Sequence, residues 1–435
     1  MRTTLERELK LEPDPQFELP LDLGRPVESR LFISTYYDTP PRSLLRSGIT
    51  LRRRVENGLS RWQLKLPRGG HARAELESPG GPAGPPHELR RLLTAHLRHG
   101  PLSPVATLRT RRVGVRVADG NHELAEVTLD AVDILDGQRQ AGAFREIEIE
   151  LLEGDDEDLD RLARVLRRAG AHDTDGSSKV ARALGAAHVD TPMLVGQLHE
   201  LEAHDPGVRL GDDPEDVHKM RVATRRSRSL VEEGEFRDEL KWLATLLGAV
   251  RDLDVLIAHL RNAVPLLDVD RVGGETIVAT LEEEREAHRD ALLTALDSTR
   301  YDDLLTRFDT GRADGHADPA AALATLQRAA KELPKEASDE QLHDLRKLAK
   351  KARYAAELSG AGGKKYISAL KELQDVIGEH QDAVLAEGHL RKLARARTAV
   401  AAGRLIEGER ERRRLARLAV PGVLADVLAR GKKVF

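Results

Sequence analysis

The amino-terminal residues place three charged side chains at alternating positions, Glu6, Glu8 and Lys10. In a β-strand alternate side chains share a face, so the pattern predicts two carboxylates and an ammonium group side by side. Such a face is costly to bury in an apolar core. A solvated edge strand would tolerate it, and so would a wet, enclosed site in which carboxylates hold a divalent cation and the lysine meets an anion. The other strands of the chain must decide between these two interpretations.

Later segments repeat this combination of one apolar face and one charged face. Segments 49–55 and 59–66 are joined by an Asn-Gly pair, the strongest short-range signal for a β-hairpin. Arg52 and Arg54 lie on one face of the first segment, and Lys65 lies on the charged face of the second. The same alternation gives further charged faces: Arg73, Glu75 and Glu77; Arg109 and Arg111; Glu126, Thr128 and Asp130; and Glu146, Glu148 and Glu150.

At least seven such segments occur in the first half of the chain, and they fit two architectures. In a sandwich the charged faces would meet water. In a closed antiparallel barrel the apolar faces pack outward against helices and the charged faces line a tunnel. The barrel is favoured because the carboxylates gather on the first and last strands, which become neighbours on closure, while the cations gather on the strands between them.

Several motifs of this half occur together and resemble those of a known family, the CYTH or triphosphate tunnel metalloenzymes. The resemblance covers residues 1–187. It implies a metal-dependent triphosphatase that uses Mg²⁺ or Mn²⁺, with inorganic triphosphate as the favoured substrate, although some relatives cyclise ATP. The motifs are the opening E-x-E-x-K, Tyr36-Tyr37-Asp38-Thr39, the run from Leu44 through Gly48 to Arg54, Lys65, Arg73-x-Glu75, the closing E-x-E-x-E, and Ser178-Lys179 with Arg182-Ala183-Leu184.

The charges of these residues suit such a substrate. A triphosphate needs a cationic cradle, and hard oxygen ligands suit one or two octahedral divalent cations. One cation would bridge phosphate oxygens and another would activate an in-line water. Taken singly, each basic residue has a surface salt bridge as an equal alternative, and Arg53, Arg61 and Arg112 are expected on the outer surface. The expected site has catalytic Glu6, Glu8, Lys10 and Glu148; phosphate-binding Lys10, Arg52, Arg54, Lys65, Arg73, Arg109, Arg111 and Lys179; and metal-binding Glu6, Glu8, Glu146, Glu148 and Glu150.

The second half of the chain has the pattern of helices. Acidic residues open a helix at residues 153–169, where they suit the N-terminal dipole, and we expect this helix to pack outside the barrel. After Asp190-Thr191-Pro192 the residues Ala, Leu, Glu and Arg recur with a 3.6-residue period. We therefore expect an α+β multidomain fold, with a closed antiparallel β-barrel tunnel at residues 1–187 and an all-α domain at residues 191–435.

This helical half contains an internal repeat. Residues 217–228 align with residues 342–353, and residues 240–252 align with residues 370–382. Two copies of a helical hairpin, each with its following helices, predict two pseudo-symmetric helical bundles related by a pseudo-twofold axis.

Each copy carries a histidine and three cations at positions i, i+3, i+7 and i+10, which form one stripe of a helix. Like charges on a stripe repel one another, so a polyanion would relieve the repulsion, while a plain basic face is the alternative. The spacing resembles that of the conserved-histidine α-helical (CHAD) domain, whose members bind inorganic polyphosphate, although Ser227 stands where an apolar residue is expected. The resemblance implies polyphosphate binding by two stripes that face each other: His218, Arg221, Arg225 and Arg228, and His343, Arg346, Lys350 and Arg353.

The composition bounds the cellular setting. Charged residues make up 33% and aromatic residues 3% of the 435 residues, which is typical of a highly charged protein with aliphatic cores. The absence of cysteine excludes disulfides and thiolate catalysis. No apolar run is long enough for a membrane span, and the start of the chain leaves no room for a signal peptide. We expect a cytoplasmic protein that associates with polyphosphate granules and has neither a membrane nor a specific nucleic acid as partner.

Three functions fit these observations. The first is a metal-dependent triphosphatase joined to a polyphosphate-binding module. The second is a non-catalytic polyphosphate adaptor, in which the tunnel grips the end of a chain. The third is a nucleotide cyclase, which shares the tunnel but releases pyrophosphate from ATP. The cations recognise phosphate, and the sequence contains no evident base-binding pocket.

Overall fold

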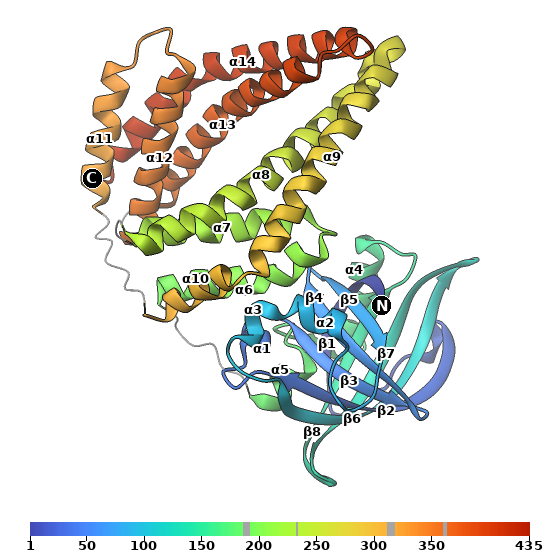
Figure 1. Cartoon of the computed structure of the whole chain (residues 1–435). Helices are drawn as coiled ribbons and strands as arrows, with labels where there is room; N and C mark the ends of the chain where they lie inside the picture. The colour runs from blue at the N-terminus through green and yellow to red at the C-terminus, as the bar shows by residue number, and fades with distance from the viewer. Residues whose placement is uncertain (186–191, 232–233, 311–317, 360–362) are drawn as a thin grey trace. The chain divides into compact units, whose positions relative to one another are not determined.

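The computed structural model describes residues 1–185, 192–231, 234–310, 318–359 and 363–435 (Figure 1). The chain forms two compact units, one of residues 1–223 with 299–309 and one of residues 224–298 with 310–435. The expected boundary between the domains, at residues 187–191, lies outside the described residues.

The first unit contains a closed antiparallel β-barrel, which confirms the predicted fold class. The strands follow one another around the barrel in the order β1-β5-β4-β3-β2-β6-β7-β8, and β1 pairs with both β5 and β8, which closes the ring. A short strand, β9 (Ala171–Asp173), pairs with the end of β1. The barrel strands are β1 (Arg2–Pro13), β2 (Arg25–Asp38), β3 (Thr50–Glu56), β4 (Leu59–Pro67), β5 (Ala72–Pro79), β6 (Ser103–Asp119), β7 (His122–Asp136) and β8 (Arg139–Leu151).

Local sequence explains the connections between these strands. The predicted hairpin between β3 and β4 turns at Asn57 and Gly58, whose φ angles of 49° and 77° lie in the left-handed region that this type of turn requires. Short helices fill the longer connections: η1 (Leu21–Leu23), α1 (Ser43–Arg46), α2 (His87–Leu92) and α3 (Thr94–Leu97).

The outward faces of the strands are apolar and are covered by helices. α4 (Asp156–Arg168) begins at a capping box on Asp155 and packs its leucines in one cluster with Ile147 and Ile149 of β8. Leu89 and Leu92 of α2 pack with strand residues such as Trp62 in a second cluster. Burial of these aliphatic side chains is the main force that holds the barrel wall to its helices.

α5 (Lys179–Leu184) lies at one end of the barrel interior. Its Val180 packs in an apolar cluster with Tyr36 of β2, Leu108 of β6 and Val132 of β7. The side chain of Lys179, one residue earlier, contacts carboxylates of β8. The inward faces of the strands are therefore apolar where α5 packs and charged beyond it.

Three helices complete the first unit. They are α6 (Met193–Leu210), the start of α7 (Pro214–Leu230) and α10 (Thr299–Thr310). Arg98, directly after α3, joins α6 and α10 to the barrel, because its guanidinium lies 2.9 Å from Glu202 and 3.0 Å from Asp309.

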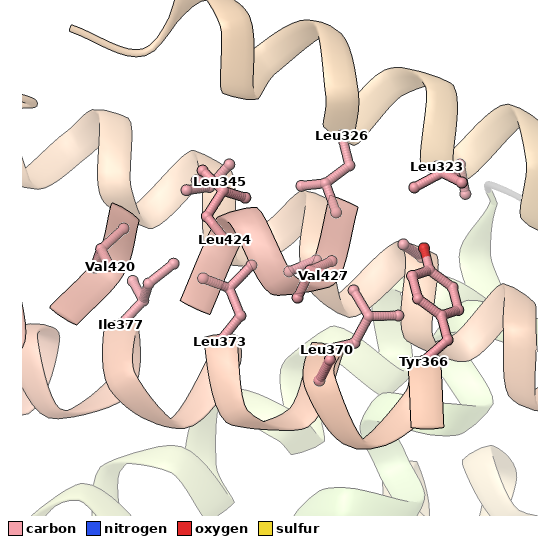
Figure 2. Close-up of a cluster of buried hydrophobic side chains, with 14 of the residues drawn as sticks. Leu323, Leu326, Leu345, Tyr366, Leu370, Leu373, Ile377, Val420, Leu424 and Val427 are labelled. Atoms are coloured by element: carbon pink, nitrogen blue, oxygen red, sulfur yellow. The ribbon is translucent and has the colours of Figure 1, made fainter. Parts of the chain in front are cut away.

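The second unit contains helices and no β-strand among its described residues. It contains the remainder of α7, then α8 (Glu235–Ala263), η2 (Val264–Asp270), α9 (Arg271–Leu296), α11 (Pro319–Glu332), α12 (Asp339–Ser359), α13 (Gly363–Leu393) and α14 (Ala399–Gly431). Figure 2 shows one of its cores, where Leu326 of α11, Leu345 of α12, Leu373 of α13 and Val427 of α14 meet. Within the described part of the chain, no helix combines the length and the apolar character needed to cross a membrane.

The sequence repeat corresponds to a repeat of helices. Its first copy lies on α7 and α8, and its second lies on α12 and α13. Asp252 of α8 and Asp382 of α13 occupy equivalent positions in the two copies. Burial raises the pKa of Asp382, and the nearby charge of Asp252 adds to the rise although Arg346 opposes it. A pseudo-twofold axis between α8 and α13 would bring such equivalent residues near each other.

Candidate active site

The barrel encloses a cavity of about 650 Å³ whose wall is mostly charged. The strands supply these side chains because alternate residues point inward, and their apolar neighbours point outward into the cores already described. The sequence-predicted residues on the wall are Glu6, Glu8, Lys10, Arg52, Arg54, Lys65, Arg73, Glu148, Glu150 and Lys179.

Two lysines converge on carboxylates where β1 meets β8. Lys10 lies opposite Glu148 in the strand register, and its Nζ is 3.2 Å from Glu148 Oε1. Lys179 Nζ donates to Glu146 and Glu148 at 2.6 Å each. Burial alone would raise the pKa of Glu148, but Lys179, Lys10 and Arg112 outweigh burial and hold it well below its usual range. These lysines and Glu148 are therefore all charged at neutral pH.

A second group of carboxylates is crowded around Glu6. Lys65 Nζ donates to Glu6, and Glu75 lies within hydrogen-bonding distance of Glu6. Burial, together with this hydrogen bond, raises the pKa of Glu75 to about 8. Burial and the charges of Glu6 and Glu148 raise the pKa of Glu150 to about 7. Protons on Glu75 and Glu150 therefore reduce the local negative charge, and a bound cation could replace these protons.

Three guanidinium groups, those of Arg52, Arg54 and Arg112, also line the wall. Arg52 donates to Gln63 Oε1 at 2.8 Å and to the hydroxyl of Tyr36 at 3.2 Å, which fixes its orientation. The Arg54 guanidinium lies 3.6 Å from the centre of the Phe32 ring. Burial and the like charges of Arg52 and Arg112 lower the pKa of Arg54 to about 10, although Glu56 opposes this effect. Arg54 is thus repelled by two neighbouring guanidinium groups, and a polyanion among them would remove this repulsion.

The structure corrects the predicted positions on β6. Arg109 and Arg111 are exposed on the outer surface, where Arg109 donates to Asp133 at 2.7 Å, so they do not line the tunnel. Arg112, expected outside, points inward and donates to Asp130 at 2.6 Å and to Glu148. The error is one residue of register. It arises because the inward face of β6 starts with apolar residues under α5, so an apolar residue does not mark the outer face there.

The outer mouth of the tunnel holds charged residues that the prediction did not include. Arg30 of β2 and Arg116 of β6 both donate to Glu126 of β7. The alternation of Glu126, Thr128 and Asp130 indicates that β7 turns these residues toward the tunnel. The partners of these residues on β6 cannot be found by counting back from the β6–β7 turn, because a bulge between Val117 and Ala118 shifts the register. Arg61, which was also expected on the outer surface, instead lines the mouth of the cavity, where its side chain is 56% exposed. Arg53 lies away from the cavity.

The two basic stripes lie on the helices that the repeat predicts. His218, Arg221, Arg225 and Arg228 are on α7, which passes from the first unit into the second, and His343, Arg346, Lys350 and Arg353 are on α12. Arg346 reaches across to α13 and donates to Gln374 O at 3.2 Å and to Gln381 at 2.7 Å. Gly378 permits this approach, since a Cβ there would lie 2.7 Å from the guanidinium. That the two stripes face each other remains a prediction.

Comparison with known proteins assigns both halves to families. The model of the CYTH domain matches residues 4–184, and the model of the CHAD domain matches residues 192–391. Two Mycobacterium tuberculosis proteins, MT2285 of strain CDC 1551 / Oshkosh and Rv2226 of strain H37Rv, are each 32% identical to the chain over 422 residues, with 82% of this chain and 81% of theirs covered. The chain is a CYTH–CHAD protein.

Solved structures resemble parts of this CYTH–CHAD protein. PptA from Streptomyces chartreusis is 22% identical with a TM-score of 0.45, over 53% of this chain and 96% of PptA. The CHAD domain from the plant Ricinus communis is 26% identical with a TM-score of 0.45, over 56% of this chain and 90% of that domain. CYTH family members act as triphosphatases or cyclases and generally use divalent metal ions, and CYTH and CHAD relatives bind triphosphates or polyphosphate.

The carboxylates of the CYTH tunnel suit a hard divalent cation by their chemistry. Glu8 lies opposite Glu150 in the strand register, Glu6 shares the face of β1 with Glu8, and the raised pKa of Glu150 reflects a local excess of negative charge. Among the described residues, no three acidic or histidine side chains converge closely enough to form a metal site. The carboxylates form ion pairs with lysines instead. A metal would have to replace the lysines at the carboxylates while an anionic substrate binds the lysines, so the two ligands would bind together.

Proposed function

We propose that this CYTH–CHAD protein hydrolyses a triphosphate, with inorganic triphosphate as the favoured substrate, inside the barrel. The observation that carries the proposal is the crowding of Arg52, Arg54 and Arg112 in an enclosed cavity. A site that holds guanidinium groups against their mutual repulsion is suited to a compact polyanion. The wall offers few apolar groups for a base, namely Leu59, Leu152 and the ring of Tyr36, so recognition rests on phosphate.

The residues of the tunnel would divide the work. Arg52, Arg54 and Arg112 would bind phosphate oxygens, and Lys10, Lys65 and Lys179 would turn from their carboxylates toward the substrate. Glu6, Glu8, Glu148 and Glu150 are the carboxylates that would hold a divalent cation such as Mg²⁺ or Mn²⁺, which supplies charge neutralisation and an activated water when bound. Glu146 does not line the cavity and is engaged by Lys179 and Arg182, so its proposed part is to hold these cations in place.

Position and electric field would account for most of the rate enhancement. Phosphoryl transfer needs the attacking and leaving oxygens in line and a stabilised charge on the transferred group. The rings of Tyr36 and Phe32 fix Arg52 and Arg54 before a substrate arrives, so little reorganisation is needed during the reaction. Of the original predictions, Lys10 and Arg73 keep their proposed phosphate-binding roles, while Arg109 and Arg111 do not.

We further propose that the helical half binds inorganic polyphosphate. The support is the charge of Arg228 on α7. Burial and the like charge of Arg237 on α8 lower the pKa of Arg228, and the Nε atom of Arg228 has no hydrogen-bond partner. A linear polyphosphate would neutralise such groups and release counterions, as nucleic-acid backbones do. The proposed ligands are the two stripes, His218, Arg221, Arg225 and Arg228, and His343, Arg346, Lys350 and Arg353.

One experiment separates the candidate functions. The protein is incubated with tripolyphosphate, ATP or thiamine triphosphate, each with Mg²⁺ or Mn²⁺, and the phosphate products are quantified. Metal-dependent release of orthophosphate supports a triphosphatase. Release of pyrophosphate from ATP, with no reaction of the other two substrates, would indicate a cyclase. Binding of phosphate chains without any turnover would indicate a polyphosphate adaptor.

A further inference from the structure

The hairpin between β4 and β5 carries two of the tunnel cations. Lys65 lies near the end of β4 and contacts Glu6, and Arg73 lies at the start of β5 with its Nε 3.6 Å from Glu8. Each proposed metal ligand of β1 thus has a partner from this hairpin. The turn between them contains Gly69 and Gly70 at φ angles of 82° and 54°, and two glycines give a turn conformational freedom that other contacts must restrict.

Arg68 is the residue that restricts this turn. It does not line the tunnel, and its side chain is only 6% exposed. One terminal nitrogen of its guanidinium donates to Asp216 at 2.8 Å and the other donates to Asp212 at 2.7 Å. Both carboxylates come from the segment that leads into α7 and from its first turn, and all these residues belong to the first compact unit. The helical segment therefore holds the tunnel hairpin from behind.

Asp216 is built into this position. It is buried, its other carboxylate oxygen accepts a hydrogen bond from His204 Nδ1 at 2.8 Å, and it packs directly on Gly207 of α6. A Cβ at residue 207 would lie 1.8 Å from the Asp216 carboxylate, so a glycine is needed there. An acidic residue in the first turn of a helix already interacts favourably with the helix dipole. The interaction with the dipole requires neither burial of Asp216 nor a hydrogen bond from Arg68, so these two features indicate a second role for Asp216.

We propose that Asp216 and Arg68 are positioning residues for the tunnel, which fix the β4–β5 hairpin so that Lys65 and Arg73 meet the substrate and keep Glu6 and Glu8 in place. The inference rests on the proposed triphosphatase function. Charge-assisted hydrogen bonds between buried groups are directional, and they transmit position through the short turn to the residues on either side. Because His218 and Arg221 follow Asp216 on the same helix, the start of the proposed polyphosphate-binding helix becomes part of the geometry of the tunnel.

The test compares full-length variants Asp216→Asn and Arg68→Gln with Asp133→Asn, which alters an arginine-bound aspartate on the outer surface of β7. A displaced network residue changes coupling by 0.5–2 kcal/mol, so kcat/KM for tripolyphosphate should fall roughly two- to thirtyfold, with a raised KM as part of the change. Asp133→Asn should match the wild type. A purely structural role for the pair predicts a different result, namely an unchanged KM and a lower apparent kcat because fewer molecules are folded.

A conservative substitution adds a second readout. Arg68→Lys retains the charge but loses the two-pronged geometry, so its KM should fall between those of the wild type and Arg68→Gln. Arg68→Gln changes only a side chain in a turn, so this variant tests the inference if Asp216→Asn does not fold. Active wild type together with a folded Arg68→Gln variant of unchanged KM would overturn the inference. Wild type that neither binds nor hydrolyses tripolyphosphate would instead overturn the proposed function.

Discussion

Lys179 Nζ lies 2.6 Å from Glu148 Oε1, although the two residues come from a short helix and from the last strand of the barrel. The same nitrogen lies 3.1 Å from Asp130 Oδ2 on β7. Burial opposes its charge, but these carboxylates raise the pKa of Lys179 well above its usual range. The lysine therefore stays charged inside the barrel, and α5 brings a cation to the carboxylates that are proposed to bind metal.

The first prediction concerns the proposed metal ligands. Glu6→Gln or Glu148→Gln should lower the turnover of tripolyphosphate by about two orders of magnitude or more, because a neutral amide is a poor ligand for a hard cation. Glu153→Gln, on an exposed side chain beyond β8, is the matched control and should be normal. Near-normal activity in a folded double variant, Glu6→Gln with Glu8→Gln, would refute the metal assignment.

The second prediction concerns the cationic wall. Arg54→Ala should reduce kcat/KM roughly tenfold to a hundredfold, with a higher KM and a lower kcat together, because the phosphate charge persists into the transition state. Lys10→Ala should behave similarly. Arg111→Ala, on the outer surface of the same barrel, should leave both constants unchanged. Steady-state kinetics of the three variants measure this directly, and an unaffected Arg54→Ala would mean that Arg54 binds no phosphate.

The third prediction concerns the corrected register of β6. Arg112→Gln removes a cation from the buried side chains of Asp130 and Glu148. Breaking a buried ion pair costs about 3–5 kcal/mol, and we expect the lower end, about 3 kcal/mol, because Lys179 still contacts both carboxylates. Arg109→Gln on the exposed face should change stability by at most about 0.5 kcal/mol. Urea unfolding measures both, and equal effects would contradict the inward position of Arg112.

The fourth prediction concerns the dependence of stability on pH. Burial would lower the pKa of His204, but hydrogen bonds to Asp216 and Glu200 outweigh it and raise the pKa to about 9. A group whose pKa is higher in the folded state stabilises the fold. For His204 this stabilisation is complete below the pKa of the unfolded state, near 6.5, and is lost as the pH rises through 9.

The His204 side chain is 21% exposed, so we expect a contribution of about 2 kcal/mol rather than the full effect of the shift. His204→Gln should destabilise the protein at pH 6 and make almost no difference at pH 10. Unfolding free energies of both proteins across this range provide the measurement. A difference that stays constant with pH would show that the charge of His204 plays no part.

The fifth prediction concerns polyphosphate. Binding of long-chain polyphosphate to the full-length protein should weaken steeply with salt, because several phosphate charges are neutralised and counterions are released. Lys350→Gln and Arg225→Gln should each reduce the salt slope by roughly 1. Lys347→Gln on α12, whose lysine pairs with Asp344 outside the stripe, is the control. Equally tight binding of duplex DNA would replace the polyphosphate site with a general polyanion site.

Much of the fold follows from the sequence because the barrel strands alternate cleanly. In residues 6–10 of β1 and 146–150 of β8 every second residue is charged, which makes the inward face predictable. The carboxylates of these strands do become neighbours, with Lys10 opposite Glu148. The Asn57-Gly58 turn fixes the register of β3 against β4 for a local reason. Helical periodicity and the aligned repeat likewise predict α7, α8, α12 and α13.

The residues that were wrongly placed depend on contacts distant in sequence. β6 carries arginines on both faces, so alternation alone cannot tell Arg111 from Arg112. The choice is made by α5, which fills one end of the barrel with Val180 and makes the inward face apolar at Leu108. The role of Arg68 depends in the same way on Asp216, 148 residues further along the chain.

The most direct test of the central claim is orthophosphate release from tripolyphosphate by the full-length protein, measured with and without Mg²⁺ or Mn²⁺. The account predicts rapid release that requires a divalent cation, stops on chelation, and exceeds the release from ATP and from thiamine triphosphate under the same conditions. Folded protein that binds tripolyphosphate but releases no orthophosphate with either metal would contradict the account and leave the tunnel as a binding site alone.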